Sequence, residues 1–267
     1  MRQMNEQHEF MCKYPEELHI PSTVMISSYS TGMEQLRLSS EMFHEVMIKD
    51  ILPKVVEPAI PIEELYEVDY FLMLRRLRLA TYGPMFTVGS YYCPHCTDET
   101  GTKGVLYREK RQVSLADVGV TVPEEGKEVP LSFVLKPEDL IFTDATITFG
   151  MNKCKHLSEI EKRKFPDHLK SLLPIAYSIK SVSDRHFIDI KEVLQFVEQL
   201  PPADFKIIHD AYIEHFSYGL NSRGSVTCSH CGKEGWFYAP VNDYYFRPTT
   251  EDLKEWARLL RDTKGSV

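Results

Sequence analysis

Two short cysteine motifs contain the residues whose type and spacing point most directly to chemistry. Cys93-Pro94-His95-Cys96 and Cys228-Ser229-His230-Cys231-Gly232 lie far apart, yet each has a CxxC spacing that presents two thiolates to one ion. A tetrahedral Zn²⁺ takes four such ligands, so the motifs together predict one closed structural zinc site per chain. The expected ligands are Cys93, Cys96, Cys228 and Cys231. Such an ion would join distant segments of the chain.

Redox chemistry is an alternative interpretation of the first motif. Cys-Pro-His-Cys after an aromatic stretch also occurs in thioredoxin-like oxidants, where a helix start stabilises the first thiolate. Here the residues that follow, 97–102, form a turn sequence without helical spacing of apolar residues. A thiol–disulfide oxidoreductase also leaves the second motif unexplained, so this alternative is less favoured.

Catalytic zinc is a third interpretation, and it lacks the residues that it needs. A hydrolytic site keeps one coordination position open and usually recruits His or a carboxylate, whereas four cysteines close the site. Neither His-Glu-x-x-His nor the His-x-Glu motif of deaminases occurs, and there is no glycine-rich phosphate loop. His95 and His230 could replace a cysteine ligand, although within a CxxC motif they more often form hydrogen bonds or face solvent. We therefore predict that the protein is not an enzyme.

The composition is that of a globular protein without a membrane segment. The chain has 267 residues, of which 43% are hydrophobic. No stretch approaches the roughly 18 consecutive apolar residues of a membrane helix, and the polar first residues predict a cytosolic protein. The net charge of −8 makes binding to a nucleic acid unlikely on electrostatic grounds. Six cysteines are too few for a disulfide scaffold, so Cys12 and Cys154 are expected to be ordinary thiols.

Helical patterns dominate the first third of the chain. A helix is expected to begin at Ser39-Ser40-Glu41 and to end or kink at Pro53. A second helix fits Glu63–Ala80, with Tyr82-Gly83-Pro84 as its terminator. Its last turns contain Arg75, Arg76 and Arg78. We interpret these three side chains as a solvated helix end, because cations are favourable near the negative end of the helix dipole.

Strands and further helices follow in an order that suggests an inserted section. The expected strands are Thr87–Tyr92, Leu131–Leu135, Thr146–Phe149 and Trp236–Tyr238. The expected helices begin near a capping box at Ser158-x-x-Glu161, at Asp189, at Phe205 and at Thr250, the last running to Arg261. Each of these helices has apolar residues at helical spacing on one side.

The order of the patterns predicts an α+β protein. A helical N-terminal part and inserted β and helical sections are expected to be joined by a four-cysteine zinc ribbon. The expected sections are 1–35, polar and extended; 36–86, helical; 87–104, the first half of the zinc ribbon; 105–150, an inserted β section; 151–223, helical; 224–248, the second half of the ribbon; and 249–267, a C-terminal helix.

The order of the motifs resembles one phage family, the baseplate hub assembly proteins of contractile-tailed T-even-type bacteriophages. The resemblance rests on Leu18-His19-Ile20-Pro21-Ser22, Leu77-Arg78-Leu79-Ala80-Thr81-Tyr82-Gly83, Cys93-Pro94-His95-Cys96, a β section at Pro130–Asp139, Leu200-Pro201-Pro202-Ala203-Asp204, Cys228-Ser229-His230-Cys231-Gly232 and Tyr245-Phe246-Arg247-Pro248. It covers most of the chain from Leu18 to Pro248. The stretch Asn152–His168 and the helical tail after Pro248 are longer than the family pattern.

The resemblance implies a non-enzymatic role in building the central hub of the tail baseplate, as an assembly chaperone or a structural subunit. The implied partners are hub, spike or tape-measure proteins, met in the host cytoplasm during assembly or in the virion tail baseplate. From the family pattern we carry over only the four cysteines. A zinc-ribbon nucleic-acid or transcription accessory protein is the alternative, which the acidic balance disfavours. The sequence does not indicate an oligomeric state.

Overall fold

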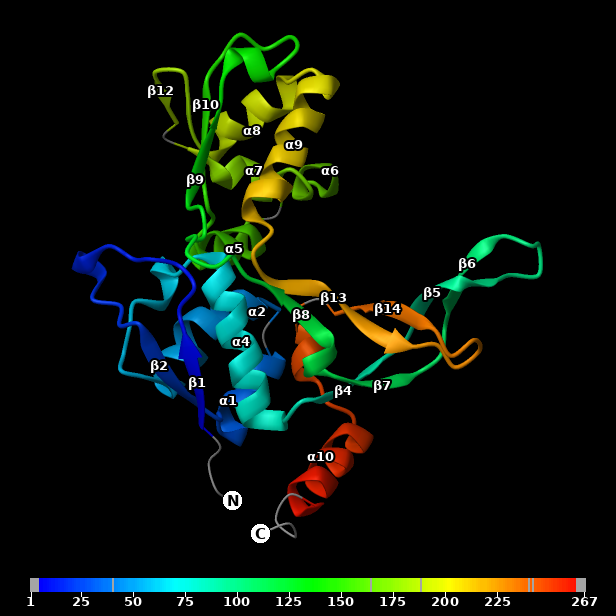
Figure 1. The fold of residues 1–267 in the computed structure, drawn as a ribbon. Coiled ribbons are helices and arrows are strands. Elements are labelled where there is room, and N and C mark those ends of the chain that lie inside the picture. Colours follow the sequence, from blue (N-terminus) through cyan, green and yellow to red (C-terminus); the bar gives the residue numbers. More distant parts are fainter. Residues whose placement is uncertain are drawn as a thin grey trace.

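The chain folds into three parts that combine helices and sheets, so it is an α+β protein. A computed structural model describes residues 5–39, 41–163, 165–187, 189–239, 241 and 243–262. Figure 1 shows an N-terminal body of helices and a small sheet, a β ribbon that extends to one side, and a lobe that stands above both. No helix in the described part of the chain combines the length and apolar character needed to cross a membrane.

The N-terminal body packs helices against a small antiparallel sheet with strand order β1-β2-β3. Its elements are β1 (Asn5–Glu9), β2 (Thr23–Ser27), α1 (Thr31–Ser39), α2 (Phe43–Val46), α3 (Leu52–Val55), β3 (Val56–Glu57) and α4 (Glu67–Tyr82). Met47, Ile51 and Leu52 are fully buried in its core together with Leu74 and Leu77 of α4. The apolar spacing that predicts the helices is therefore the spacing of their core-facing side chains.

The helix that contains Pro53 begins later than predicted and continues past the proline. The expected start at Ser39-Ser40-Glu41 is wrong, because Ser39 ends α1 and α2 begins at Phe43, while Ser40 lies outside the described residues. Of the two outcomes predicted at Pro53, an end or a kink, the helix does not end there: Pro53 lies in the first turn of α3, which follows a π-helical turn at Met47–Ile51 and continues to Val55. The wider turn accommodates a proline, whose ring would clash with a regular preceding turn.

Helix α4 ends as the sequence predicts but begins later. Gly83, at φ +75°, terminates it, and its N–H donates to the carbonyl of Leu79 at 3.0 Å. The first expected residues instead form a separate 3₁₀ turn, Ile62–Glu64. The interpretation of its arginines as a solvated helix end is wrong for Arg78, whose side chain is fully buried. The hydrogen-bond acceptors that make this burial favourable are backbone carbonyl oxygens beyond the end of α4.

The β ribbon is assembled from two stretches of chain that are distant in sequence. The first contributes β4 (Met85–Val88), β5 (Tyr91–Thr97), β6 (Lys103–Tyr107), β7 (Arg111–Ser114) and β8 (Val118–Thr121), and the second contributes β13 (Gly219–Thr227) and β14 (Glu234–Tyr238). Five of these strands form one sheet in the order β6-β5-β14-β13-β8, whereas β4 pairs with β7. The single strand expected at Thr87–Tyr92 is therefore divided between two sheets.

The lobe is inserted between the two stretches of the ribbon and has its own core. Its elements are β9 (Ser132–Leu135), β10 (Ile147–Gly150), α5 (Cys154–Lys162), α6 (Asp167–Lys170), α7 (Leu173–Ser178), β11 (Ile179–Val182), β12 (Arg185–His186), α8 (Ile190–Gln199) and α9 (Pro202–Phe216). The strands form an antiparallel sheet in the order β12-β11-β10-β9. Phe149, Leu173, Ala176 and Ile208 are fully buried in the core between this sheet and helices α7, α8 and α9.

The helix starts in the lobe confirm one prediction and contradict another. Asp189 is the N-cap of α8, and its carboxylate accepts a hydrogen bond from the N–H of Lys191 at 3.2 Å. The capping box expected at Ser158 is wrong, because Ser158 is a buried residue inside α5. Helix α5 begins at Cys154, whose N–H donates to the carbonyl of Leu65 and thereby ties the lobe to the N-terminal body.

Two buried arginines hold the C-terminal segment on the N-terminal body. Arg78 donates to the carbonyl oxygens of Tyr245, Gly83 and Met85 at 3.0, 2.6 and 2.7 Å. Arg37 of α1 donates to the carbonyl of Phe246 at 3.1 Å and to the carboxylate of Glu34. Tyr245 and Phe246 are buried in the N-terminal core, so the chain returns there after completing the ribbon.

The C-terminal helix, α10 (Thr250–Asp262), matches the predicted range closely and is anchored at its first turn. The buried carboxylate of Asp252 accepts hydrogen bonds from Thr87 at 2.8 Å and from Gln112 at 3.2 Å. Trp256 lies so close to Gly83 that a Cβ there would be 2.4 Å from its ring. Gly83 thus serves two purposes, ending α4 and leaving room for α10.

Replacement of Arg78 by methionine should destabilise the protein strongly. The substitution leaves the carbonyl oxygens of Tyr245, Gly83 and Met85 buried without a donor, which is expected to cost about 3 kcal/mol or more. Urea unfolding measures this loss. Arg76→Met, on the same helix with a side chain 45% exposed, is the matched control and should change stability little. Equal stability of the two variants would contradict the assigned role of Arg78.

Candidate metal centre

The four cysteines of the two CxxC motifs lie together at the junction of the two halves of the ribbon. Cys93 and Cys96 belong to β5, and Cys228 and Cys231 belong to the turn between β13 and β14. Their sulfur atoms all lie within 4.8 Å of one another. Cys93, Cys96 and Cys228 are buried, whereas Cys231 is exposed. The structure thus brings together the four residues that the motif spacing predicts as ligands.

The distances between the sulfur atoms suit a tetrahedral metal ion. The sulfur atoms of Cys93 and Cys231 are 3.5 Å apart, and those of Cys96 and Cys228 are 3.7 Å apart. Four thiolates bound to Zn²⁺ at about 2.3 Å have neighbouring sulfur atoms about 3.8 Å apart. Both contacts join cysteines of different motifs, so each motif is engaged by the other, whereas the two cysteines of a redox-active CxxC react with each other. The donor set and its geometry therefore fit a closed zinc site.

Two glycines allow the backbone to bring the sulfur atoms together. Gly232, at φ +68°, follows the second motif, and its N–H donates to the carbonyl of Cys228 at 2.9 Å. Gly235 lies where β14 passes β5, and a Cβ there would be 2.6 Å from the carbonyl oxygen of Tyr92. Any side chain at Gly235 would push the two halves of the ribbon apart.

The thiols of the cluster differ in their tendency to ionise. Burial opposes ionisation of Cys228, but N–H groups of Cys231 and His230, together with the hydroxyl of Tyr91, lower its pKa to about 6. A hydrogen bond with Tyr107 lowers the pKa of Cys96, yet burial and the neighbouring thiols raise it to about 12. Without a cation the four sulfur atoms repel one another once ionised, and a divalent ion removes this repulsion.

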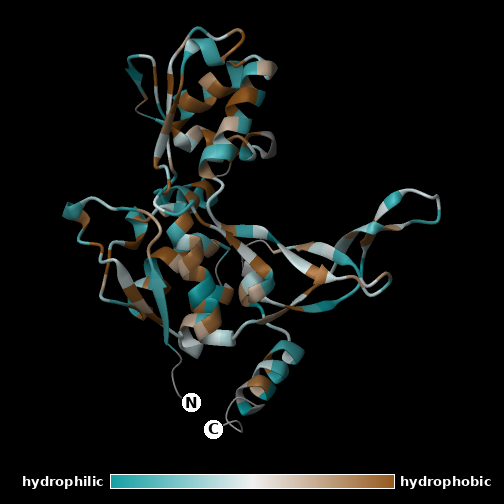
Figure 2. Ribbon diagram, viewed as in Figure 1, coloured by the Kyte–Doolittle hydropathy of each residue, from teal (hydrophilic) through white to brown (hydrophobic). Residues whose placement is uncertain are grey.

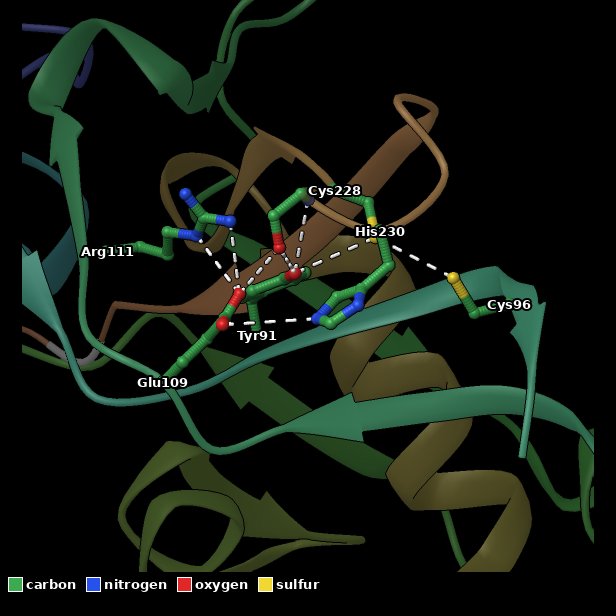
Figure 3. Close-up of polar contacts among 7 residues, drawn as sticks. Tyr91, Cys96, Glu109, Arg111, Cys228 and His230 are labelled. Atoms are coloured by element: carbon green, nitrogen blue, oxygen red, sulfur yellow. Dashed lines mark hydrogen bonds and ion pairs between the residues drawn. The ribbon is translucent and has the colours of Figure 1, made fainter. Parts of the chain in front are cut away.

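A polar network that includes Tyr91, Glu109 and Arg111 lies beside the sulfur of Cys228 (Figure 3). The hydroxyl of Tyr91 lies 3.7 Å from the sulfur of Cys228 and 2.9 Å from the hydroxyl of Ser229. Ser229 donates to the carboxylate of Glu109 at 2.8 Å, and Arg111 forms an ion pair with the same carboxylate at 3.1 Å. Hydrogen bonds and charges of this kind orient the ligands of a metal site.

The histidines within the motifs lie outside the sulfur cluster. His230 stacks on Tyr107, with ring centroids 4.0 Å apart, and its Nε2 lies 4.0 Å from the carboxylate of Glu109. His95 is exposed on β5. Neither belongs to the group of residues whose donor atoms converge. The alternative in which a histidine replaces a cysteine ligand is therefore not supported by the geometry.

The other two cysteines are buried away from this cluster. The N–H of Cys12 donates to the carboxylate of Asp69 at 3.1 Å, and the sulfur of Cys154 lies 2.8 Å from the carbonyl oxygen of Ile62. Burial raises the pKa of both thiols. Both surroundings agree with the prediction that Cys12 and Cys154 are ordinary thiols.

Sequence reasoning did not identify the residues that support the cluster. Tyr91 precedes the first motif by two residues, and an aromatic residue there is also expected in any strand. Glu109 and Arg111 lie in a charged stretch, Arg108–Arg111, that resembles an ordinary solvated turn. Only the pairing of β5 with β6 and the return of the chain at Ser229 bring these groups together.

Comparison with known proteins places the chain in a family. The model of a family described as T4 bacteriophage base plate protein matches residues 11–238, which include all four cysteines of the cluster. No curated protein and no solved structure matches the chain. The match covers most of the N-terminal body, the whole inserted lobe and both halves of the ribbon. The chain therefore belongs to the T4 bacteriophage base plate protein family.

Proposed function

We propose that this baseplate protein is a non-enzymatic hub assembly or structural subunit, and that its four clustered cysteines hold one structural Zn²⁺. The observation that carries the proposal is the convergence of Cys93, Cys96, Cys228 and Cys231 within a chain that belongs to a baseplate family. Its partners would be hub, spike or tape-measure proteins, met in the host cytoplasm during assembly.

A structural role for the ion follows from where the cluster lies in the chain. The two close sulfur pairs are separated by 138 and 132 residues. Bringing such distant residues together costs roughly 4 kcal/mol of chain entropy. In the sheet, β5 and β14 share a single paired position, Tyr92 with Trp236. Strands β8 and β13 also join the two halves, at three paired positions. A metal bound by both halves would stabilise the other end of the junction, where β5 and β14 pair only once.

The coordination set argues against catalysis at the ion. Four cysteine ligands leave no open position for water or a substrate. Three of the four cysteines are also buried, which limits access to the ion. Its expected contribution is therefore to folding, and it would hold the ribbon and the inserted lobe in one arrangement for assembly.

Loss of one ligand should release the metal. We expect one zinc per chain by elemental analysis of the purified protein, and none in Cys228→Ser. Loss of the ion removes on the order of 10 kcal/mol of binding free energy, so the ribbon should unfold. Cys154→Ser is the matched control, because it changes a buried cysteine outside the cluster and should retain its zinc. A zinc-free protein with a redox-cycling Cys93–Cys96 pair would contradict the proposed site.

Replacement of Tyr91 by phenylalanine should weaken metal binding without abolishing it. The substitution removes the hydroxyl near the sulfur of Cys228 and keeps the ring, and loss of such a group typically lowers metal affinity about tenfold or more. Competition with a chromophoric chelator measures the change. Tyr92→Phe is the control, because Tyr92 packs on Trp236 in the adjacent position. Equal zinc affinities of the two variants would show that the Tyr91 hydroxyl has no role.

The baseplate role is tested by purification of the tagged chain from infected cells. We expect a hub, spike or tape-measure protein to co-purify, as identified by mass spectrometry, because an assembly subunit must contact them. Comparison with the composition of mature tails then distinguishes a chaperone, which is absent from tails, from a structural subunit. Recovery of the chain without any tail protein would count against the proposed function.

A further inference from the structure

The end of the inserted lobe presents two apolar side chains to solvent. The loop 136–146 joins β9 to β10 and lies at the far end of the lobe from the N-terminal body (Figure 1). In this loop Ile141 is 62% exposed, and Phe142, at 70%, is more exposed than any other large apolar side chain in the described ranges. Figure 2 shows this apolar stretch in the loop beside hydrophilic residues.

The backbone of the loop is held by a buried carboxylate. Asp204, in the first turn of α9, is fully buried and accepts hydrogen bonds from the N–H of Ile141 at 2.7 Å and of Phe142 at 3.1 Å. It also accepts a hydrogen bond from the hydroxyl of Thr143 at 2.6 Å. Burial acts to raise the pKa of Asp204, but these hydrogen bonds outweigh it and lower the pKa. The carboxylate is thus ionised, and its position near the N-terminus of α9 favours its charge.

The side chains of Ile141 and Phe142, whose backbone is held by Asp204, are not part of the core of the lobe. The neighbouring Leu140 packs against the lobe core, whereas Ile141 and Phe142 are exposed and do not belong to it. A flexible loop could fold these two side chains back onto the lobe, which would remove apolar surface from water. The hydrogen bonds to Asp204 instead fix the backbone in the outward conformation. Rigid presentation of apolar anchors lowers the entropy lost when a partner binds.

The charged residues of the loop indicate the chemistry of the partner. Glu138, Asp139 and Asp144 of the loop are exposed, and Lys136 is its one basic residue, lying 3.7 Å from Glu138. The loop therefore carries a net acidic charge together with two exposed apolar side chains. A complementary surface has an apolar pocket surrounded by lysine or arginine side chains.

We propose that Ile141 and Phe142 form an anchor that inserts into an apolar pocket with a basic rim on another protein of the phage tail. The inference rests on the proposed function and adds the surface through which this chain binds its partner. We call the two residues the apolar tip. The pocket belongs to the partner, and the tip supplies the two side chains that fill it.

The test compares the amount of tail protein that co-purifies from infected cells with tagged variants of the full chain. The amount of partner captured by the double variant Ile141→Ser with Phe142→Ser should be about tenfold lower than with the wild type, because central apolar anchors dominate binding. Its melting temperature and metal content should match those of the wild type, since both side chains are exposed. The matched control is Leu106→Ser with Tyr238→Ser, which changes two side chains of the ribbon that are 56% and 61% exposed. This control should capture the partner as the wild type does.

Two further variants separate the roles of charge and of loop rigidity. Glu138→Lys with Asp144→Lys should reduce capture while leaving the apolar tip in place, because it opposes a basic rim. Asp204→Asn keeps the size of the side chain and removes its charge, so capture should fall although Ile141 and Phe142 remain. If Asp204→Asn lowers the melting temperature, its loss of capture could come from instability. The serine double variant, which leaves the core unchanged, then decides whether the apolar tip binds the partner.

The outcomes distinguish failure of the apolar tip from failure of the proposed function. Wild-type capture of an identified tail protein, equalled by the serine double variant, would overturn the tip and leave the baseplate role intact. Capture of only a second copy of the chain would also overturn it. If the wild-type chain captures no tail protein, the proposed function fails and the apolar tip fails with it.

Discussion

After the inserted lobe the chain must return to the ribbon and pair with its first half. The arrangement of the other parts of the protein depends on this constraint. Strand β14 must pair with β5, and β13 with β8, although the whole inserted lobe lies between the two pairs of partners in sequence. Burial of apolar side chains is non-directional and would tolerate several registers of two short strands. The sulfur cluster does not, because four thiols meet within 4.8 Å only when Cys93 and Cys96 face the turn that contains Cys228 and Cys231.

Arginine side chains make a second contact between segments that are distant in sequence, through hydrogen bonds to backbone carbonyls instead of through thiols. After β14 the chain returns to the N-terminal body, where Arg78 and Arg37 donate to the carbonyl oxygens of Tyr245 and Phe246. A buried guanidinium is costly unless its donors are paired, and these carbonyls pair several of them. Both contacts therefore use directional groups at the places where sequence-distant segments must meet in one register. The apolar cores fill the space between these points.

The features that could be predicted from the sequence are those encoded within a few neighbouring residues. The CxxC spacing identifies the cysteines, and regular apolar spacing identifies α4, α8 and α10. Helix α1 has Gly32 near its start and few buried side chains, so its pattern is weak. The burial of Arg78 depends on a backbone carbonyl 167 residues away. Every residue has such a carbonyl, so the residue type at that position does not reveal the contact. The network around Tyr91 is hidden for the same reason, because its partners come from β7 and from the turn after β13.

The connections between the parts explain how a closure at the ribbon affects the lobe. The chain enters the lobe after β8 and leaves it through α9 into β13, so both crossings begin or end on strands of the ribbon sheet. Near these crossings Val68, Val129 and Met151 form a small buried cluster with Cys12. If the two halves of the ribbon separate, β13 loses its pairing with β8, β14 loses its pairing with β5, and the second crossing loses its fixed end. The position of the lobe relative to the N-terminal body then rests on the small cluster, on α5 and on the backbone contacts of Tyr66 and Glu67 with Lys153 and Asn152. These contacts involve far fewer buried apolar side chains than the cores on either side. A metal bound at the ribbon would thus stabilise the orientation of a surface on the lobe that it does not touch.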